Sequence, residues 1–231
     1  IVCGNSLLGV KKDLWNAQLF SELETLKPLY FNETNPTKKQ EYKNRINALI
    51  SQITSGHKEF DFEIYFSEVF HSTSNSPFDK GGAGGFDVVI ANPPYLKERD
   101  NKKVFEIVNN SAFGKKYHQG KMDYWYYFLH KAIDIVRQEG TISYITSRYW
   151  LNSSGAKKLI NRISKEISFV VFVDIGKLKV FEEVAGHHMV AVYKKSKSVD
   201  SFLYKKLENI ISDIAKDKDT ENIFIKFLYN K

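Results

Sequence analysis

The feature that most constrains this chain of 231 residues is a short apolar run that two consecutive prolines end. Residues 86–91 read F-D-V-V-I-A, and Asn92-Pro93-Pro94-Tyr95 follow directly. Such a run predicts a strand buried on both faces, as in a parallel sheet. Prolines cannot donate to a strand ladder, so the strand must end there. Ligands of open parallel sheets bind just beyond the carboxyl ends of strands, which makes these four residues the first candidates for a site.

The rest of the chain alternates between helical and strand patterns. Apolar spacing over residues 10–60 predicts two helices in an α-hairpin, and residues 71–85 read as a glycine-rich loop. Further helices are expected at 122–138, 153–167 and within 200–231, and further strands at 141–146, 169–175 and 189–193. Strands separated by helices predict an α/β fold with a parallel-rich sheet and flanking helices.

Positive charge is concentrated in two stretches. The net charge is +7, yet residues 10–80 carry nine basic against ten acidic groups. Residues 97–121 carry seven basic against three acidic groups, and residues 148–179 carry seven against two. Basic groups with aromatics among them suit phosphates and unstacked bases. The candidate DNA contacts are Lys97, Arg99, Lys102, Lys103, Lys115, Lys116 and Arg148.

Composition argues against several other classes of protein. Cys3 is the only cysteine, so an internal disulfide and a cysteine-rich zinc site are excluded, and a reducing cytoplasm is expected. The six histidines show no ligand spacing and are interpreted as structural or surface residues, so no metal is expected. The sequence has no apolar run of the ~18 residues that a membrane span needs and no visible secretory signal.

The residues after the first strand indicate a specific chemistry. Two prolines stiffen the turn, so the Asn92 amide oxygen and the Pro93 carbonyl form a rigid pair of acceptors beside the flat ring of Tyr95. An exocyclic amino group of a nucleobase has two N–H donors, and its lone pair is delocalised into the ring. Accepting both hydrogens localises that lone pair, and the nitrogen can then attack a methyl group held in line. The base must leave the duplex to reach such a site.

Residues 86–95 resemble motif IV of amino-methyltransferases that use S-adenosylmethionine. Four other segments support one branch, the gamma-class adenine-N6 DNA methyltransferases of type IIG enzymes, which fuse methylase and nuclease. Residues 1–8 resemble motif III, residues 121–140 motif V, residues 140–151 motif VI, and residues 180–184 with the strand at 189–193 motif VIII. The resemblance implies a partial Rossmann-like fold that runs from motif III to motif VIII.

The resemblance also implies roles for individual residues. Asn92 and the Pro93 carbonyl would accept from the adenine amino group within the motif Asn92-Pro93-Pro94-Tyr95. Tyr95 would stack on one face of the flipped adenine and Phe181 on the other, and Asn5 would lie near the adenine of the cofactor. Phe181 could equally be a core aromatic, and Asn5 could equally be a turn residue. The expected partner is double-stranded DNA with a flipped adenine.

Some parts of the family pattern do not occur in this sequence. The glycine-rich loop that binds S-adenosylmethionine should precede motif III, and glycines 81–85 do not replace it because they precede a strand. We therefore expect residues 1–195 to be part of a catalytic domain, with a mostly helical insertion at 10–80 and a helical segment at 196–231 leading toward a target-recognition region. Without a neighbouring strand, residues 88–90 would form an exposed apolar edge, covered by the rest of the polypeptide or by another chain. The segment alone is expected to be inactive.

Three other functions stay open from sequence. The same motif serves enzymes that methylate protein glutamine or RNA bases, although the insertion and the basic segments favour DNA. A cytosine-N4 methyltransferase is the second alternative, although its motif IV more often begins with Ser. The third is a DNA-binding or assembly module without activity of its own.

Overall fold

The computed structural model describes residues 4–10, 13, 15–57, 59–70, 84–176, 187–196, 202–206 and 224–225. The chain divides into two compact units, Ile1–Gly85 and Phe86–Lys231. The boundary between the units lies just after the helical insertion predicted at 10–80, whereas the sequence pattern predicted one domain over residues 1–195. The two units are described separately.

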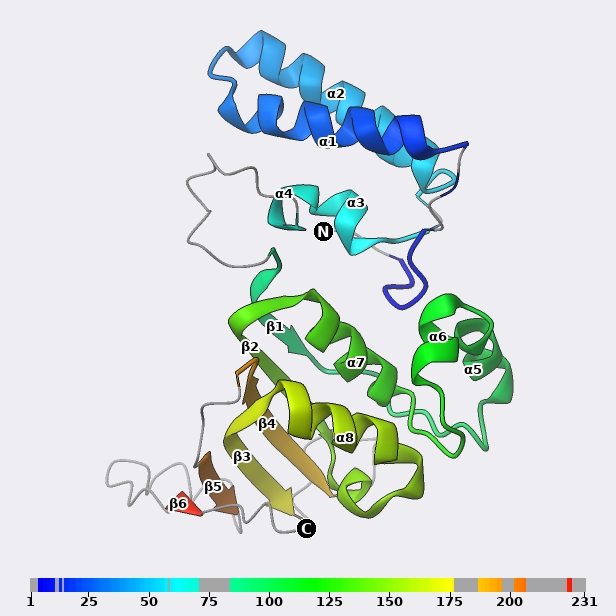
Figure 1. Ribbon diagram of the computed structural model, residues 1–231, viewed down its shortest axis with the longest axis vertical. Helices are drawn as coiled ribbons and strands as arrows, with labels where there is room; N and C mark the ends of the chain where they lie inside the picture. The colour runs from blue at the N-terminus through cyan, green and yellow to red at the C-terminus, as the bar shows by residue number, and fades with distance from the viewer. Residues whose placement is uncertain are drawn as a thin grey trace. The chain divides into compact units, whose positions relative to one another are not determined.

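The first unit is built on the expected helical hairpin (Figure 1). Its helices are α1 (Ala17–Asn32), α2 (Pro36–Ile53), α3 (Phe62–Tyr65) and α4 (Ser67–Phe70). The side chain of Asn35 accepts from the amides of Thr37 and Lys38, and Pro36 follows at the first helical position, so α2 has a well-defined start. Pro28 lies inside α1 and does not end it.

The core of the hairpin comes from two apolar stripes. It includes Leu23 on α1, Leu49 and Ile53 on α2, and Ile64 on α3, all of them buried. Lys27 is also buried, because its ammonium donates to the carbonyls of Ile64 (2.9 Å) and Tyr65 (2.8 Å). That cation caps the carboxyl end of α3 and so joins the hairpin to the short helix.

The second unit is a mixed sheet with helices. Its strands are β1 (Phe86–Ala91), β2 (Val136–Ser147), β3 (Ser168–Gly176), β4 (His188–Lys194), β5 (Phe202–Lys206) and β6 (Phe224–Ile225). Its helices are α5 (Lys102–Asn109), α6 (Ala112–Tyr117), α7 (Trp125–Ile135), α8 (Lys157–Glu166) and the short 3-10 helices η1 (Arg148–Asn152) and η2 (Ser154–Ala156). The predicted α/β class is confirmed, with strands where all four were expected.

The sheet has the order β1-β2-β4-β3-β5-β6. The pairs β1–β2 and β3–β5 are parallel, whereas β4 runs antiparallel to both β2 and β3, and β6 runs antiparallel to β5. The described sheet is therefore less parallel than expected. Only residues 177–187 connect β3 to β4, and a parallel crossover needs about a dozen residues or more, so β4 returns antiparallel.

Helices α7 and α8 lie together against the sheet (Figure 1). Helix α7 is rich in large buried side chains, including Trp125, Tyr127 and Ile133, and its apolar residues pack against the buried strand residues. The Tyr144 hydroxyl on β2 donates to the Phe128 carbonyl at 3.0 Å, which ties the helix to the strand. This packing fixes the start of α7 beside the carboxyl ends of β1 and β2.

Two sequence expectations are wrong in this unit. Strand β1 is not buried on both faces, because Val88 is 53% and Ile90 is 76% exposed. Within the described sheet β1 pairs only with β2, so these side chains have no strand beside them, as expected for an apolar edge. Residues 202–206 form β5 rather than part of a helix, because they pair with β3.

None of the described helices combines the length and the apolar character that a bilayer crossing requires. Among the same described residues, no group of three or more His, Cys, Asp or Glu side chains is placed to hold a metal ion.

Candidate active site at the end of β1

Strand β1 ends at Ala91, and the four motif residues form the loop that leaves it. Asn92 and Pro94 are exposed, Pro93 is buried, and Tyr95 is half-buried. The Tyr95 hydroxyl lies 3.1 Å from the Asn92 amide oxygen and 2.9 Å from the carbonyl of Ile145, and it can donate its one proton to either. The Tyr95 ring is thereby tied to β2, and the Asn92 oxygen keeps a lone pair for a ligand.

Burial governs the protonation of this tyrosine. Desolvation raises the pKa of Tyr95 to about 12. The hydroxyl therefore remains protonated at neutral pH and acts as a hydrogen-bond donor. The His188 ring packs edge-on against Tyr95 with centroids 5.5 Å apart, which further restricts the tyrosine.

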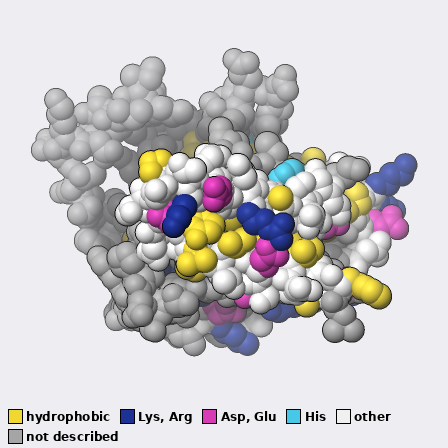
Figure 2. Space-filling view, turned by 90° about the horizontal axis from the view of Figure 1, so that it is seen from above, with side chains coloured by type: hydrophobic (Ala, Val, Ile, Leu, Met, Phe, Trp, Pro, Cys, Tyr) yellow, Lys and Arg dark blue, Asp and Glu magenta, His cyan; other side chains and the backbone are white. Residues whose placement is uncertain are grey.

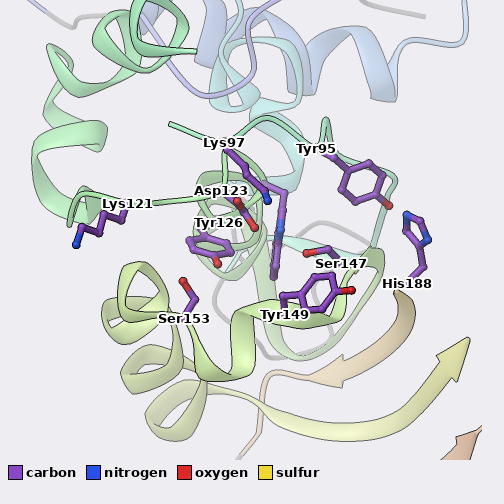
Figure 3. A pocket seen from close by; sticks show the side chains of 10 residues that line it. Tyr95, Lys97, Lys121, Asp123, Tyr126, Ser147, Tyr149, Ser153 and His188 are labelled. Atoms are coloured by element: carbon purple, nitrogen blue, oxygen red, sulfur yellow. The ribbon is translucent and has the colours of Figure 1, made fainter. Parts of the chain in front are cut away.

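A cavity of about 350 Å³ opens next to Tyr95 (Figure 3). Its lining comes from four separate segments of the chain: Tyr95, Lys97, Lys121, Asp123, Trp125, Tyr126, Ser147, Tyr149, Ser153 and His188. The volume is in the range of sites that hold small molecules, and aromatic rings alternate with a few polar groups, as such sites require. Asn92, Pro93 and Pro94 are not among the lining residues; the Asn92 amide oxygen contacts the hydroxyl of Tyr95, which lines the cavity.

The sheet brings two of these segments together. Ser147 ends β2 and pairs with His188, which begins the antiparallel β4. Because β4 runs in reverse, its first residue lies at the same edge of the sheet as the carboxyl end of β2. The cavity thus lies at the carboxyl end of β2, next to the loop that leaves β1.

The loop after the motif pairs with the segment that precedes α7. Lys97 and Asp123 form an isolated antiparallel bridge, the amide of Tyr124 donates to the Leu96 carbonyl at 2.7 Å, and that of Glu98 donates to Met122 at 3.0 Å. Asp123 therefore lines the cavity beside Lys97 (Figure 3). Burial raises the pKa of Asp123, and the Lys97 ammonium partly offsets that effect.

Lys121 is held in an unusual backbone conformation at the rim. Its φ is 55°, in the left-handed region that few residues other than glycine adopt. The backbone at Gly155 packs closely against this turn, because a Cβ there would lie 2.0 Å from the Lys121 carbonyl. The Gln119 side chain also bridges the turn to η2 and α8, donating to Ser154 at 2.8 Å and accepting from the Lys158 amide at 2.6 Å.

The predicted DNA contacts fall in different places. Lys97 lines the cavity, and Arg99 is exposed and pairs with Asp100 at 3.0 Å. Lys102 and Lys103 begin α5, and Lys115 and Lys116 end α6; all four are exposed. Arg148 forms an ion pair with Asp174, whose side chain is only 2% exposed, so this arginine also serves the fold.

The other two predicted site residues, Asn5 and Phe181, do not belong to the described part of the sheet unit. Asn5 belongs to the first unit, and its side-chain oxygen accepts from the Leu7 amide at 3.1 Å, as a turn residue does. Phe181 lies outside the described residues. Asn5 alone provides too few groups for S-adenosylmethionine, so the described residues do not by themselves fit that cofactor.

Sequence reasoning missed most of the cavity wall. The missed residues are Lys121, Asp123, Trp125, Tyr126, Ser147, Tyr149, Ser153 and His188. The available signal was positional: residues 121–126 begin a helix, and residues 147–153 follow a strand. His188 lines the cavity, whereas the sequence offered no role for it beyond a structural or surface one.

Comparisons with known proteins place the chain. Residues 5–181 match the model of the Eco57I restriction-modification methylase family. Among solved structures, the chain is similar to the type IIG restriction endonuclease BpuSI (18% identity, TM-score 0.41), covering 61% of this chain and 18% of that one. A putative class I S-adenosylmethionine-dependent methyltransferase from Listeria monocytogenes also matches (11% identity, TM-score 0.40), covering 77% of this chain and 61% of that one.

A modification subunit of a putative type I restriction enzyme from Vibrio vulnificus YJ016 is a third match. It has 17% identity and a TM-score of 0.41, covering 53% of this chain and 25% of that one. The chain thus spans less than two thirds of each of these proteins. No curated protein matches it. Because the family model covers most of its residues, this chain belongs to the Eco57I restriction-modification methylase family.

Proposed function

We propose that this chain supplies the acceptor side of a DNA methyltransferase that transfers a methyl group to adenine N6 within a bacterial restriction-modification or phage-defence system. The observation that carries the proposal is the exposed Asn92, whose amide oxygen contacts the hydroxyl of Tyr95 at the wall of the cavity. Membership of a restriction-modification methylase family supports it. The expected partner is double-stranded DNA with one adenine flipped out, and the expected location is the cytoplasm.

The reaction needs little from the protein beyond positioning. The Asn92 oxygen and the Pro93 carbonyl accept the two amino hydrogens of adenine, and Tyr95 stacks on its ring. S-adenosylmethionine supplies an electrophilic methyl group. The adenine nitrogen would accept this methyl group through its lone pair and would then lose a proton to solvent, while Asn92, Pro93 and Tyr95 hold the base in place. Fixed dipoles that meet the developing positive charge lower the barrier.

The cofactor would be bound mainly by residues other than those assembled at this cavity. Asn5 stays the one predicted contact with its adenine, and Phe181 stays the predicted second stacking aromatic. No step of the reaction is assigned to either residue.

A methyltransferase that acts on protein glutamine, RNA or cytosine would use the same acceptor geometry. The cationic side chains of Lys97 and Lys121 at the cavity favour a nucleic acid over a neutral side-chain amide. A module that binds DNA without catalysis is the remaining alternative, and it gives no reason for an exposed amide oxygen beside a tyrosine ring.

Product analysis tests the proposal. The full-length protein that carries this chain would be incubated with labelled S-adenosylmethionine and, in parallel, with duplex DNA, RNA or a glutamine-containing protein, and the products would be digested and separated. We expect N6-methyladenine from duplex DNA only. N4-methylcytosine, methylated RNA or methylglutamine would replace the proposal with the corresponding alternative, and salt-sensitive DNA binding without any methylated product would favour the non-catalytic module.

A further inference from the structure

Tyr149 is a large aromatic side chain that the fold holds in solvent. It is 63% exposed, although it lies only two residues beyond the end of β2. The next residue, Trp150, is 1% exposed and packs edge-on against Trp125 with centroids 5.7 Å apart. On the other side, Arg148 is ion-paired to buried Asp174. Both neighbours of Tyr149 in the chain are thus anchored to the core.

The anchoring continues through the backbone. The amide of Arg148 donates to the His187 carbonyl at 2.9 Å, and the His187 ring lies 5.6 Å from the Tyr149 ring. These contacts leave the short helix η1 little freedom. A ring that is already fixed loses little conformational entropy when a ligand contacts it, so the exposed tyrosine is pre-organised for binding.

The surroundings of the ring indicate the chemistry of the ligand. Tyr149 and Tyr95 line the same cavity, one from η1 and one from the loop after β1 (Figure 3). Lys97 and Lys121 line it too, and neither forms an ion pair with any other described residue. The backbone of Lys121 lies in the left-handed region, with φ 55°. Lys97 also interacts electrostatically with the Asp123 carboxylate, so the two lysines outweigh one acidic group at the cavity. Aromatic faces beside such cations fit a ligand that carries both a flat ring and a phosphate.

We propose that Tyr149 is a nucleobase-stacking residue, which contacts an unpaired base of a nucleic-acid strand while Lys97 and Lys121 contact its phosphates. The inference rests on the proposed function and adds a base contact to the same site. It assigns part of substrate recognition to the segment after β2. A protein substrate would offer the ring no base.

The test compares two substitutions that differ in the aromatic face. Tyr149→Phe keeps the ring, whereas Tyr149→Leu keeps an apolar side chain without it. Each variant and the unchanged protein would be titrated with a short single-stranded oligonucleotide that carries one 2-aminopurine, whose fluorescence falls on stacking. A second oligonucleotide of the same length, abasic at that position, separates contacts to the base from contacts to phosphate.

We expect Tyr149→Phe to bind and quench like the unchanged protein, and Tyr149→Leu to bind the base-containing strand about fivefold more weakly or worse. The abasic strand should bind all three proteins alike. Equal binding and quenching by both variants would overturn the inference, as would an equal loss on the abasic strand. Circular dichroism and thermal melts of the two variants would exclude misfolding, which an exposed side chain makes improbable on physical grounds.

This readout is independent of methyl transfer, so the two proposals can fail separately. If the unchanged protein forms N6-methyladenine but the two variants bind alike, the role of Tyr149 is wrong and the proposed function stands. If the ring-dependent difference appears but no adenine is methylated, the stacking role stands and the proposed reaction is wrong.

Discussion

The helical hairpin and the cavity beside Tyr95 are assembled in different ways. The hairpin joins α1 and α2 through stripes of residues on two consecutive helices. The cavity joins four segments that extend from Tyr95 to His188 in the sequence, and the order and direction of the strands bring them together. Local periodicity therefore determines the first region, and sheet topology determines the second.

The two regions also differ in charge. The insertion that contains the hairpin is almost neutral, and in Figure 2 hydrophobic, basic and acidic side chains are interspersed on the visible described surface. The sheet unit carries both basic stretches, and two of its lysines reach the cavity. Contacts with a polyanion are accordingly expected on the sheet unit, and the hairpin is expected to tolerate charge changes.

Replacing Asn92 should have the largest effect on activity. Asn92→Ala removes one of the two oxygens proposed to hold the amino group, and losing one such preorganised dipole costs about 10²–10³ in kcat. Rates of methyl transfer under saturating DNA would measure the loss. Asn161→Ala, which changes an exposed asparagine on α8, is the matched control and should leave the rate unchanged. An active Asn92→Ala protein would contradict the assigned chemistry.

Truncating the core of the hairpin should give the largest loss of stability. Leu49 is 1% exposed, so Leu49→Ala should lower the free energy of unfolding of the first unit by about 2–5 kcal/mol. Leu29 on α1 is 47% exposed, and Leu29→Ala should change the free energy of unfolding by less than about 0.5 kcal/mol. Denaturant titrations followed by circular dichroism would compare them, and equal effects would show that the hairpin core is misassigned.

Replacing Arg148 should have a smaller effect on stability. Arg148 is both a predicted DNA contact and the ion-pair partner of the buried Asp174. Arg148→Ala leaves the buried Asp174 carboxylate without its partner, and because Arg148 is half exposed we expect a loss of about 2 kcal/mol, below the range for a fully buried pair. Combining it with Asp174→Asn should recover part of that stability. Unchanged melting together with weaker DNA binding would instead assign Arg148 to DNA alone.

The smallest expected effect is a change in pH dependence at α7. His130 is buried and stacked on Tyr117, and burial, together with the nearby cations Arg162, Lys158 and Lys116, lowers its pKa to about 3. The neutral ring stabilises the fold fully above its ordinary pKa of about 6.5, and stability falls by up to about 1.4 kcal/mol per unit as pH drops toward 3. His130→Phe should flatten that slope in unfolding titrations at pH 7, 6 and 5. An unchanged slope would assign the acid sensitivity to other groups.

Much of the fold could be predicted because each element has a local signal. The hairpin stripes, the strand before Asn92 and the apolar run at 169–175 all follow from periodicity. Exposure of Val88 and Ile90 follows only from the expected lack of a neighbouring strand, because an edge strand and a central strand have the same apolar composition. Residues 202–206 have helical spacing, yet pairing with β3 makes them a strand.

Only part of the candidate site could be predicted, because most of its residues come together only in the folded sheet. Two prolines after an apolar run mark the loop at Asn92 without any knowledge of tertiary structure. Asp123, Tyr149 and His188 have no such mark, because they join the cavity only through the bridge at Lys97, the end of β2 and the reversal of β4. Their convergence requires the strand order, which one sequence does not contain.

The most direct measurement is a structure of the protein bound to DNA that contains its methylation site. We expect an adenine outside the duplex, with its amino nitrogen about 3 Å from both the Asn92 amide oxygen and the Pro93 carbonyl, and with its ring on Tyr95. An adenine that remains stacked in the duplex, or a flipped base bound elsewhere, would contradict this expectation.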